Sequence, residues 1–337
     1  MKKVLFTSLL ILLLSAAIPF QAQATFPGKN IVFWDLGQSD EQKDNTLIEA
    51  YDLATKNNYG QALKIIDQKI QTSPKLTTLH VMKGLILNEL RMYIPAVRAL
   101  NDAQMIEGRH PGIHYGFCEV YRNLGMTDLS LQACRVAEEV HRFSPEAHYE
   151  YAQTLIATGE MKLANKSLST AAELDPSNAQ YHYQRGMNFY YLNQYEAAEN
   201  AFLKALSIDT SDVDSAYQLA YIYAAQNKAT LANQQIVKVL QIQKEHPKIQ
   251  SAKLLLEYVK NNALDKLPLK IIPHDYHVGR SKSYYQSGDY GLALIEIETA
   301  VKLKPNDLQT KEILIGLTSF LLRINTTEKT IKEMISI

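Results

Sequence analysis

Residues 145–176 read PEAHYEYAQTLIATGEMKLANKSLSTAAELDP, and residues 181–209 read YHYQRGMNFYYLNQYEAAENAFLKALSID. Each stretch carries a small residue midway along its first apolar segment, Ala152 and Gly186, and these two positions lie 34 residues apart. A constant interval of this size is typical of repeat architectures, in which each unit buries its apolar face by stacking on its neighbours. The two stretches therefore predict a repeat protein.

Small residues recur at the same interval along most of the chain. The first series is Ala50, Gly84, Cys118, Ala152, Gly186 and Ala220. The second series is Ala62, Ala96, Ser130, Ala164, Ala198 and Ala232, and the third is Ala103, Ala137, Ala171 and Ala205. Two helices approach closely only where their side chains are short, so these series predict antiparallel helix pairs. They hold from about Lys43 to His246, which predicts six units over residues 43–246.

A turn separates the two helices of each unit. In four units it is marked by residues that suit the end of a helix. These are Gly125, Gly159, Asn193 and Asn227. Units then close with a helix-stopping proline, as at Asp175-Pro176 and Ser73-Pro74.

These positions together resemble the tetratricopeptide repeat family. The fourth unit matches its pattern at Ala152, Leu155, Gly159, Ala164, Ala171 and Pro176, and the fifth at Gly186, Tyr195, Ala198, Phe202 and Ala205. The resemblance implies an all-α, right-handed superhelical solenoid of antiparallel helix pairs, with the first helix of each unit on its inner wall. The chain departs from the family near the start of the first helix, where His114, His148 and His182 stand in place of a Trp.

The 34-residue register breaks after residue 246. Residues 247–273 carry three prolines, and one helix fits between Ile249 and Asn262. Leu264–Pro273 contains two prolines too close together for a regular partner helix. The segment is therefore predicted to be an irregular helix and a proline-containing linker, and it could act as a hinge or only as a kink.

A further unit is expected beyond the break, at residues 274–306. It restores Gly288, Tyr290, Ala293, Ala300 and Pro305 to the repeat positions. Residues 307–337 are expected to form capping helices, one over 307–323 and another from Thr326 to Ile337. A solenoid needs such a cap to cover its final apolar face.

The N-terminus reads as a secretory signal. Lys2 and Lys3 precede an apolar run from Val4 to Leu14, and Ala22-Gln23-Ala24 has the form of a cleavage site. Residues 1–24 are therefore predicted to be removed after Ala24, which leaves 25–42 as an N-terminal segment and places the protein in the periplasm or outside the cell. An uncleaved membrane anchor is the alternative, although the apolar run is short for a bilayer span of ~20 residues. No membrane span is predicted in the mature chain.

A column of tyrosines repeats every 34 residues on the first helices, at Tyr115, Tyr149, Tyr183 and Tyr217. Residues one and two turns further on share its face, which is not the face used for packing within a unit. The predicted partner-binding residues are Tyr115, Glu119, Arg122, Tyr149, Gln153, Tyr183, Met187, Tyr190, Tyr217 and Tyr221. Tyr supplies broad contact area and a hydroxyl at low entropic cost, so the column predicts a groove that binds protein segments. Alternatively, the tyrosines pack against one another between adjacent first helices, and both interpretations can hold.

The histidines do not predict a metal site. His114, His148 and His182 are one per unit, and neighbouring first helices lie ~10 Å apart, whereas a metal–His bond is ~2 Å. His274 and His277 stand at the start of a repeat helix, where packing is the simpler account. The sequence contains no His-Glu-x-x-His, no Gly-x-Ser-x-Gly, no phosphate loop and no dinucleotide fingerprint. We expect no enzymatic activity and no cofactor.

Cys118 and Cys134 stand on the first and second helix of one unit, equally far from the turn between them. Antiparallel pairing places them opposite each other, and an exported protein meets oxidising conditions. Packed helix axes usually lie 8–10 Å apart, however, whereas a disulfide needs Cα atoms within ~7 Å. A disulfide and two buried free thiols both remain open.

The functional hypothesis is an adaptor or scaffold. Lys and Arg number 35, as do Asp and Glu, so no basic excess points to nucleic acid. Resemblance to exported bacterial tetratricopeptide proteins implies partners in envelope assembly, secretion, pilus biogenesis or polysaccharide export. The alternative is a structural subunit that docks through its convex or end surfaces and leaves the groove empty.

Overall fold

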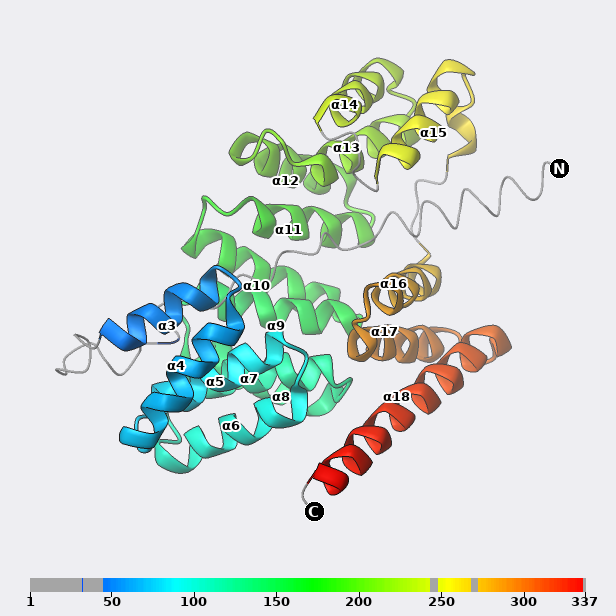
Figure 1. The fold of residues 1–337 in the computed structure, drawn as a ribbon. Helices are drawn as coiled ribbons and strands as arrows, with labels where there is room; N and C mark the ends of the chain where they lie inside the picture. The colour runs from blue at the N-terminus through cyan, green and yellow to red at the C-terminus, as the bar shows by residue number, and fades with distance from the viewer. Residues whose placement is uncertain (1–31, 33–44, 243–247, 268–271, 336–337) are drawn as a thin grey trace. The chain divides into compact units, whose positions relative to one another are not determined.

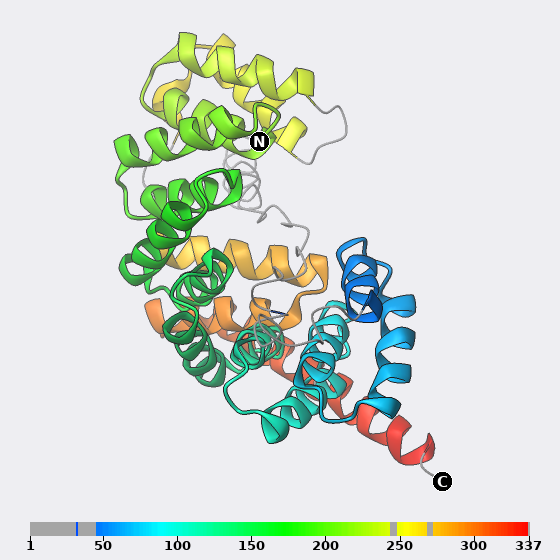
Figure 2. The ribbon, with the colours of Figure 1, turned by 90° about the vertical axis from the view of Figure 1, so that its left-hand side faces the viewer.

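The computed structural model describes residue 32 and residues 45–242, 248–267 and 272–335, with side chains up to residue 321. These residues form helices and turns, with no strand among them (Figure 1). Consecutive helices run antiparallel as pairs, which a second view also shows (Figure 2). The predicted signal peptide and nearly all of the N-terminal segment lie outside the described residues.

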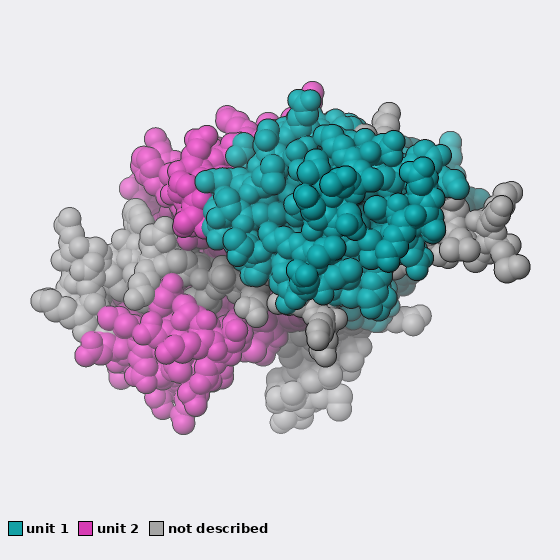
Figure 3. Space-filling model, turned by 90° about the horizontal axis from the view of Figure 1, so that it is seen from above, with its two compact units in different colours: residues 1–20, 157–161, 178–337 teal, residues 21–156, 162–177 magenta. Residues whose placement is uncertain are grey.

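The described residues belong to two compact units (Figure 3). Among the described residues, unit 2 comprises those up to residue 156 and residues 162–177. Unit 1 comprises residues 157–161 and the described residues from 178 onward. Within the range that the sequence assigns to repeats, first helices from α5 to α13 are 13 residues long and second helices from α4 to α14 are 14. This constancy follows from the fixed interval of the small residues.

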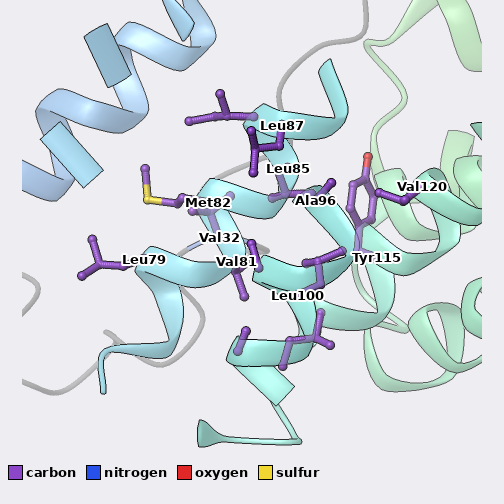
Figure 4. Packing of buried hydrophobic residues seen from close by; sticks show 14 of the residues in the cluster. Val32, Leu79, Val81, Met82, Leu85, Leu87, Ala96, Leu100, Tyr115 and Val120 are labelled. Atoms are coloured by element: carbon purple, nitrogen blue, oxygen red, sulfur yellow. The ribbon is translucent and has the colours of Figure 1, made fainter. Parts of the chain in front are cut away.

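Unit 2 holds the first four helix pairs, apart from the turn between α9 and α10. Their bounds are α3 (Asn45–Thr55), α4 (Tyr59–Thr72), α5 (Thr77–Glu89), α6 (Tyr93–Ile106), α7 (Pro111–Asn123), α8 (Thr127–Val140), α9 (Pro145–Ala157) and α10 (Met161–Leu174). Figure 4 shows the core of this unit, in which apolar side chains of α5, α6 and α7 interlock.

Unit 1 holds two further pairs and the C-terminal helices. Their bounds are α11 (Ala179–Tyr191), α12 (Tyr195–Ile208), α13 (Val213–Ala225), α14 (Ala229–Ile242), α15 (Lys248–Lys260), η3 (Leu264–Lys266), α16 (Pro273–Ser287), α17 (Tyr290–Leu303) and α18 (Leu308–Ile335). The small-residue series pack here as the sequence predicts. A Cβ built on Gly186 would stand 2.5 Å from the ring of Phe202 on α12, so only glycine allows this approach.

The turn inside each pair has the same backbone conformation. Its residue adopts a positive φ at Asn57, Arg91, Gly125, Gly159, Asn193 and Asn227, which are 34 positions apart. The next residue then donates its N–H to the carbonyl five positions back, as from Met126 to Tyr121 at 2.8 Å. Gly and Asn tolerate this left-handed conformation better than other residues do. Arg91 is the one member of the six that the turn pattern does not predict.

The C-terminal third differs from expectation in one respect. The break after α14 contains α15 and the short 3₁₀ turn η3, as the prolines predict, and α16 and α17 form the displaced pair. The two predicted capping helices are instead the single helix α18, which runs through Asn325 and Thr326. Asn and Thr are weak helix formers, but neither removes a backbone hydrogen bond as proline does, so they do not end the helix.

Candidate functional site

In unit 2 the predicted inner-wall residues join three successive first helices. Tyr115 and Glu119 on α7 are buried, and the Tyr115 hydroxyl donates to Glu119 Oε1 at 3.2 Å. Asn88 on α5 donates from Nδ2 to the other oxygen of Glu119 at 3.4 Å. Tyr149 and Gln153 on α9 are only half-buried. The wall therefore has a buried polar layer on α7 and a more accessible row on α9.

A charged pair connects that layer to the row on α9. Arg122, which is buried, lies 2.5 Å from Glu150 Oε2 and also donates to the Glu150 carbonyl at 3.3 Å. Burial raises the pKa of Glu119 well above its usual value, and the charges of Glu150 and Glu89 raise it further. Burial, followed by the charge of Glu150, raises the pKa of Glu89 to about 7. Three carboxyl groups thus share the positive charge of Arg122.

In unit 1 the predicted wall residues are all buried. Only 3% of Tyr183 and 1% of Tyr217 is exposed, and Met187, Tyr190 and Tyr221 are buried as well. The rings of Tyr190 on α11 and Tyr221 on α13 meet edge to face with centroids 6.3 Å apart. This contact joins two adjacent first helices through Tyr190 and Tyr221, which lie one or two turns beyond the column tyrosines Tyr183 and Tyr217.

Tyr183 also contacts the second helix of its own pair. Its ring centroid lies 5.8 Å from that of Phe202 on α12. The tyrosine column is predicted to lie on a face separate from packing within a unit, so this contact differs from that expectation.

The structure adds residues to this wall that the sequence analysis missed. Tyr191 follows Tyr183 by two helical turns on α11 and meets the ring of Tyr276 on α16, with centroids 4.8 Å apart. The Tyr191 hydroxyl lies 3.2 Å from His277 Nε2. The spacing of eight residues after Tyr183 could have placed Tyr191 on the same face, but no pattern in the sequence indicates that α16 covers it.

A buried charged network holds α16 to α17. Glu296 on α17 accepts from Arg280 Nε at 2.6 Å and lies 2.7 Å from His277 Nδ1. Arg280 also donates to the hydroxyls of Tyr276 at 3.3 Å and Tyr284 at 2.8 Å. Burial alone would lower the pKa of Arg280, but the Glu296 carboxylate, together with Tyr276 and Tyr284, outweighs burial and raises it. The hairpin therefore carries its own internal polar core.

His148 and His274 serve local structure. His148 lies 2.9 Å from Glu138 Oε1 and 3.0 Å from the Arg142 carbonyl. Burial lowers the pKa of His148, but these hydrogen bonds outweigh burial and raise it. At the start of α16, His274 lies 3.0 Å from the Thr310 hydroxyl of α18. Across the part of the chain that the structure describes, no three His, Cys, Asp or Glu side chains are grouped so that they could hold a metal ion.

Cys118 and Cys134 form a disulfide in the structure, with Cα atoms 4.6 Å apart. Ser130, a small residue of α8 that faces α7, donates to the Cys118 carbonyl at 3.0 Å. Because each Cα lies about 2.3 Å from its helix axis, facing Cα atoms come this close at the usual 8–10 Å spacing of packed helix axes. Both cysteines are buried, so reagents reach them only after unfolding.

We expect the oxidised protein, unfolded in guanidinium without reductant, to take up no alkyl group from iodoacetamide. After reduction it should take up two, which intact mass measures directly. Reduction should also lower the free energy of unfolding by about 3 kcal/mol, because the bond closes a loop of 16 residues. Uptake of two alkyl groups without reductant would show that the cysteines are free thiols.

Comparisons with known proteins agree with this geometry. Family models described as tetratricopeptide repeat match residues 145–178, 179–212 and 274–307. No curated protein sequence matches the chain. In the part of the chain that the structure describes, no helix combines the length and the apolar character needed to cross a membrane.

Several solved structures are similar to this chain at low identity. The Cut9–Hcn1 hetero-tetramer of the APC/C is 13% identical with a TM-score of 0.50, covering 86% of this chain and 51% of that one. YrrB, a protein of the same repeat type described as having an unusual peptide-binding site, is 18% identical with a TM-score of 0.47, covering 56% and 97%. The pilF protein of Pseudomonas aeruginosa is 14% identical with a TM-score of 0.47, covering 71% and 97%. Residues 145–212 and 274–307 are thus matched as tetratricopeptide repeats, and the helix pairs around them follow the same pattern.

Proposed function

We propose that this chain is a non-enzymatic adaptor or scaffold of the bacterial cell envelope that binds segments of partner proteins along its first helices. Tetratricopeptide repeats are generally interaction modules without enzymatic activity, which supports the coarser part of the proposal. The predicted signal peptide supports a location in the periplasm or outside the cell. The partners would be components of envelope assembly, secretion, pilus or polysaccharide-export machinery.

The accessible row on α9 carries the proposal. Tyr149 and Gln153 remain half-buried and lie one turn apart, while Tyr115, Glu119 and Arg122 beside them are buried. An accessible Tyr on a rigid base offers contact area at little entropic cost. Binding should therefore centre on α9, with the polar layer on α7 as its support rather than as its contact surface.

A second candidate function is a structural subunit that docks through convex or end surfaces. Two apolar side chains favour it, because Met105 at the end of α6 is 87% exposed and Phe143 between α8 and α9 is 80% exposed. Exposed apolar side chains of this size are candidates for contact with another protein. The two candidate functions place the partner on different residues of the same unit.

A pair of double variants separates the two candidates. The partner is first captured in cells that express the full chain with a photo-crosslinking residue. This residue replaces Gln153 in one strain and Phe143 in a second strain, and the captured protein is identified by mass spectrometry. The captured protein is then co-purified with each double variant. If it binds on α9, Tyr149→Ala with Gln153→Ala should reduce the amount of partner recovered at least tenfold, as loss of an interface anchor does. The matched control, Met105→Ala with Phe143→Ala, should leave recovery unchanged.

The opposite pattern, loss only in the Met105 and Phe143 variant, would support docking through end surfaces and would overturn binding on α9. Circular dichroism at 222 nm must show equal helix content in both variants. All four side chains are at least partly exposed, so neither double substitution opens a cavity in the core.

A further inference from the structure

The hairpin of α16 and α17 lies, within unit 1, against helices that precede it by many residues. The Tyr191 hydroxyl of α11 meets His277 of α16 across 86 residues of sequence. The Thr299 hydroxyl of α17 donates to the Ala157 carbonyl at 2.8 Å, across 142 residues. The hairpin is therefore packed back onto an earlier first helix and onto the turn after α9.

The contact covers the face of α11 that carries the tyrosine column. Tyr183 and Tyr191 are two turns apart on that face, and Tyr191 is covered by the ring of Tyr276. α16 also lies near Tyr183. Burial raises the pKa of Tyr183, as do Asp214, Asp212 and Tyr276 of α16, whereas the charge of Arg280 on α16 lowers it. The α11 section of the wall thus has an occupant from the same chain.

The fit at the turn after α9 is equally close. A Cβ built on Gly159, whose φ is +83°, would stand 3.2 Å from Thr299 Cγ2 and 3.7 Å from His277 Nε2. The same histidine binds Glu296 inside the hairpin and Tyr191 outside it. Hydrogen bonds of Tyr191 and Thr299 attach the hairpin to α11 and to this turn. The two helices of the hairpin are joined to each other by Glu296, which receives Arg280 and His277, and by Ser281, which donates to the Ala293 carbonyl.

We propose that α16 and α17 form an autoinhibitory cover, which detaches from α11 as a folded pair and exposes the Tyr183–Tyr191 face. This proposal rests on the proposed function in one respect, namely that the wall of first helices is where partners bind. A partner segment that reaches α11 must then displace the hairpin, while the row at Tyr149 and Gln153 on α9 is not governed by it.

The test removes the attachment and leaves the hairpin's internal network intact. In the full chain, Tyr191→Phe deletes the hydroxyl that meets His277 but keeps the ring, and Thr299→Val deletes the donor to Ala157 at nearly constant volume. The matched control is Tyr223→Phe with Thr318→Val. It removes a hydrogen bond to Glu199 at 2.9 Å and one to the Leu314 carbonyl at 2.8 Å, both in unit 1 and away from the attachment.

Two measurements are made on each protein. Nitration of Tyr183 by tetranitromethane, quantified by peptide mass spectrometry, should rise about tenfold or more in the Tyr191→Phe/Thr299→Val variant and less than twofold in the control, because each lost bond shifts the equilibrium several-fold. Hydrogen exchange of the α16 and α17 amides should change less than threefold, because the detached pair stays folded.

Two outcomes would overturn the proposal. One is nitration of Tyr183 that does not exceed that of the control. The other is nitration that rises together with exchange throughout α12, α13 and α17, which would mean that the contact is a structural part of unit 1. Neither outcome affects binding at α9, so failure here is distinct from failure of the proposed function, which the Tyr149 and Gln153 variant tests independently.

Discussion

Replacing Glu296 with leucine is expected to destabilise the α16–α17 hairpin by about 3–5 kcal/mol, because it leaves the buried Arg280 without its counter-charge. Glu296 is fully buried and receives Arg280 Nε at 2.6 Å and His277 Nδ1 at 2.7 Å. Both partners lose their acceptor at once, and water cannot replace it at a site with no exposed surface. This is the largest effect that we expect from one substitution in the hairpin.

Hydrogen exchange of the α16 and α17 amides is the appropriate measurement, because it reads local opening separately from unfolding of the rest of the chain. The single variant should exchange about a hundredfold to a thousandfold faster than the wild type. The control is Glu296→Leu combined with Arg280→Met, which removes both charges and keeps apolar volume. If the single variant were as protected as this double variant, the ion pair would not be what holds the hairpin together.

The repeat architecture could be predicted from sequence because short-range rules set it. Small residues at a fixed interval determine where two helices approach, and Gly or Asn at the turn determines where the first helix ends. Both rules act within one helix pair, so they can be applied without considering the rest of the chain. Arg91 shows their limit, because the backbone there has φ 59° although the residue does not favour it. The neighbouring turns and the packing of α5 on α6 impose that conformation.

The exposure of the tyrosine column could not be predicted in the same way. The periodicity places Tyr183 and Tyr217 on a shared face of successive first helices, but burial depends on what covers that face. On α11 the ring of Tyr191 is covered by Tyr276 of α16, 85 residues later. Tyr217 lies under the ammonium group of Lys248, 5.3 Å from its ring centroid. Both covering residues follow the break in the register, where the period carries no information.

The disulfide shows a third case, in which the register was sufficient and the open question was one of distance. Equal distance from the turn placed Cys118 and Cys134 opposite each other. The value of 8–10 Å separates helix axes, and each Cα lies about 2.3 Å from its axis, so facing Cα atoms come within the reach of a disulfide at ordinary helix spacing. The 4.6 Å between these two Cα atoms agrees with that geometry.

The second large effect concerns pH and involves His110, the residue that caps the N-terminus of α7. Its Nδ1 accepts from the Gly112 N–H at 3.1 Å, which requires an unprotonated nitrogen. Burial, followed by the charge of His141, lowers the pKa of His110 to about 4, against the opposing effect of a hydrogen bond with the Val32 backbone. In the unfolded chain the pKa returns to about 6.5.

The sign of the effect follows from these two values. Between pH 6.5 and pH 4 the unfolded chain binds a proton at His110 that the folded protein does not, so stability falls as the pH falls through this window. The raised pKa values of Glu89 and Glu119 act in the opposite direction, because these groups bind protons in the folded protein first. The contribution of His110 to the pH dependence of stability must therefore be measured by comparison with a variant rather than from the wild type alone.

The variant His110→Asn provides that comparison, because Asn keeps an acceptor for the cap of α7 but does not titrate. Between pH 7 and pH 5 we expect the wild type to lose about 2 kcal/mol of unfolding free energy relative to this variant, whatever the difference between them at pH 7. Guanidinium unfolding at both pH values, followed by circular dichroism, measures the change. If the difference in unfolding free energy between wild type and variant were the same at both pH values, His110 would titrate alike in the folded and unfolded chain. A buried cap acceptor cannot do so, and the role of His110 at the start of α7 would then be wrong.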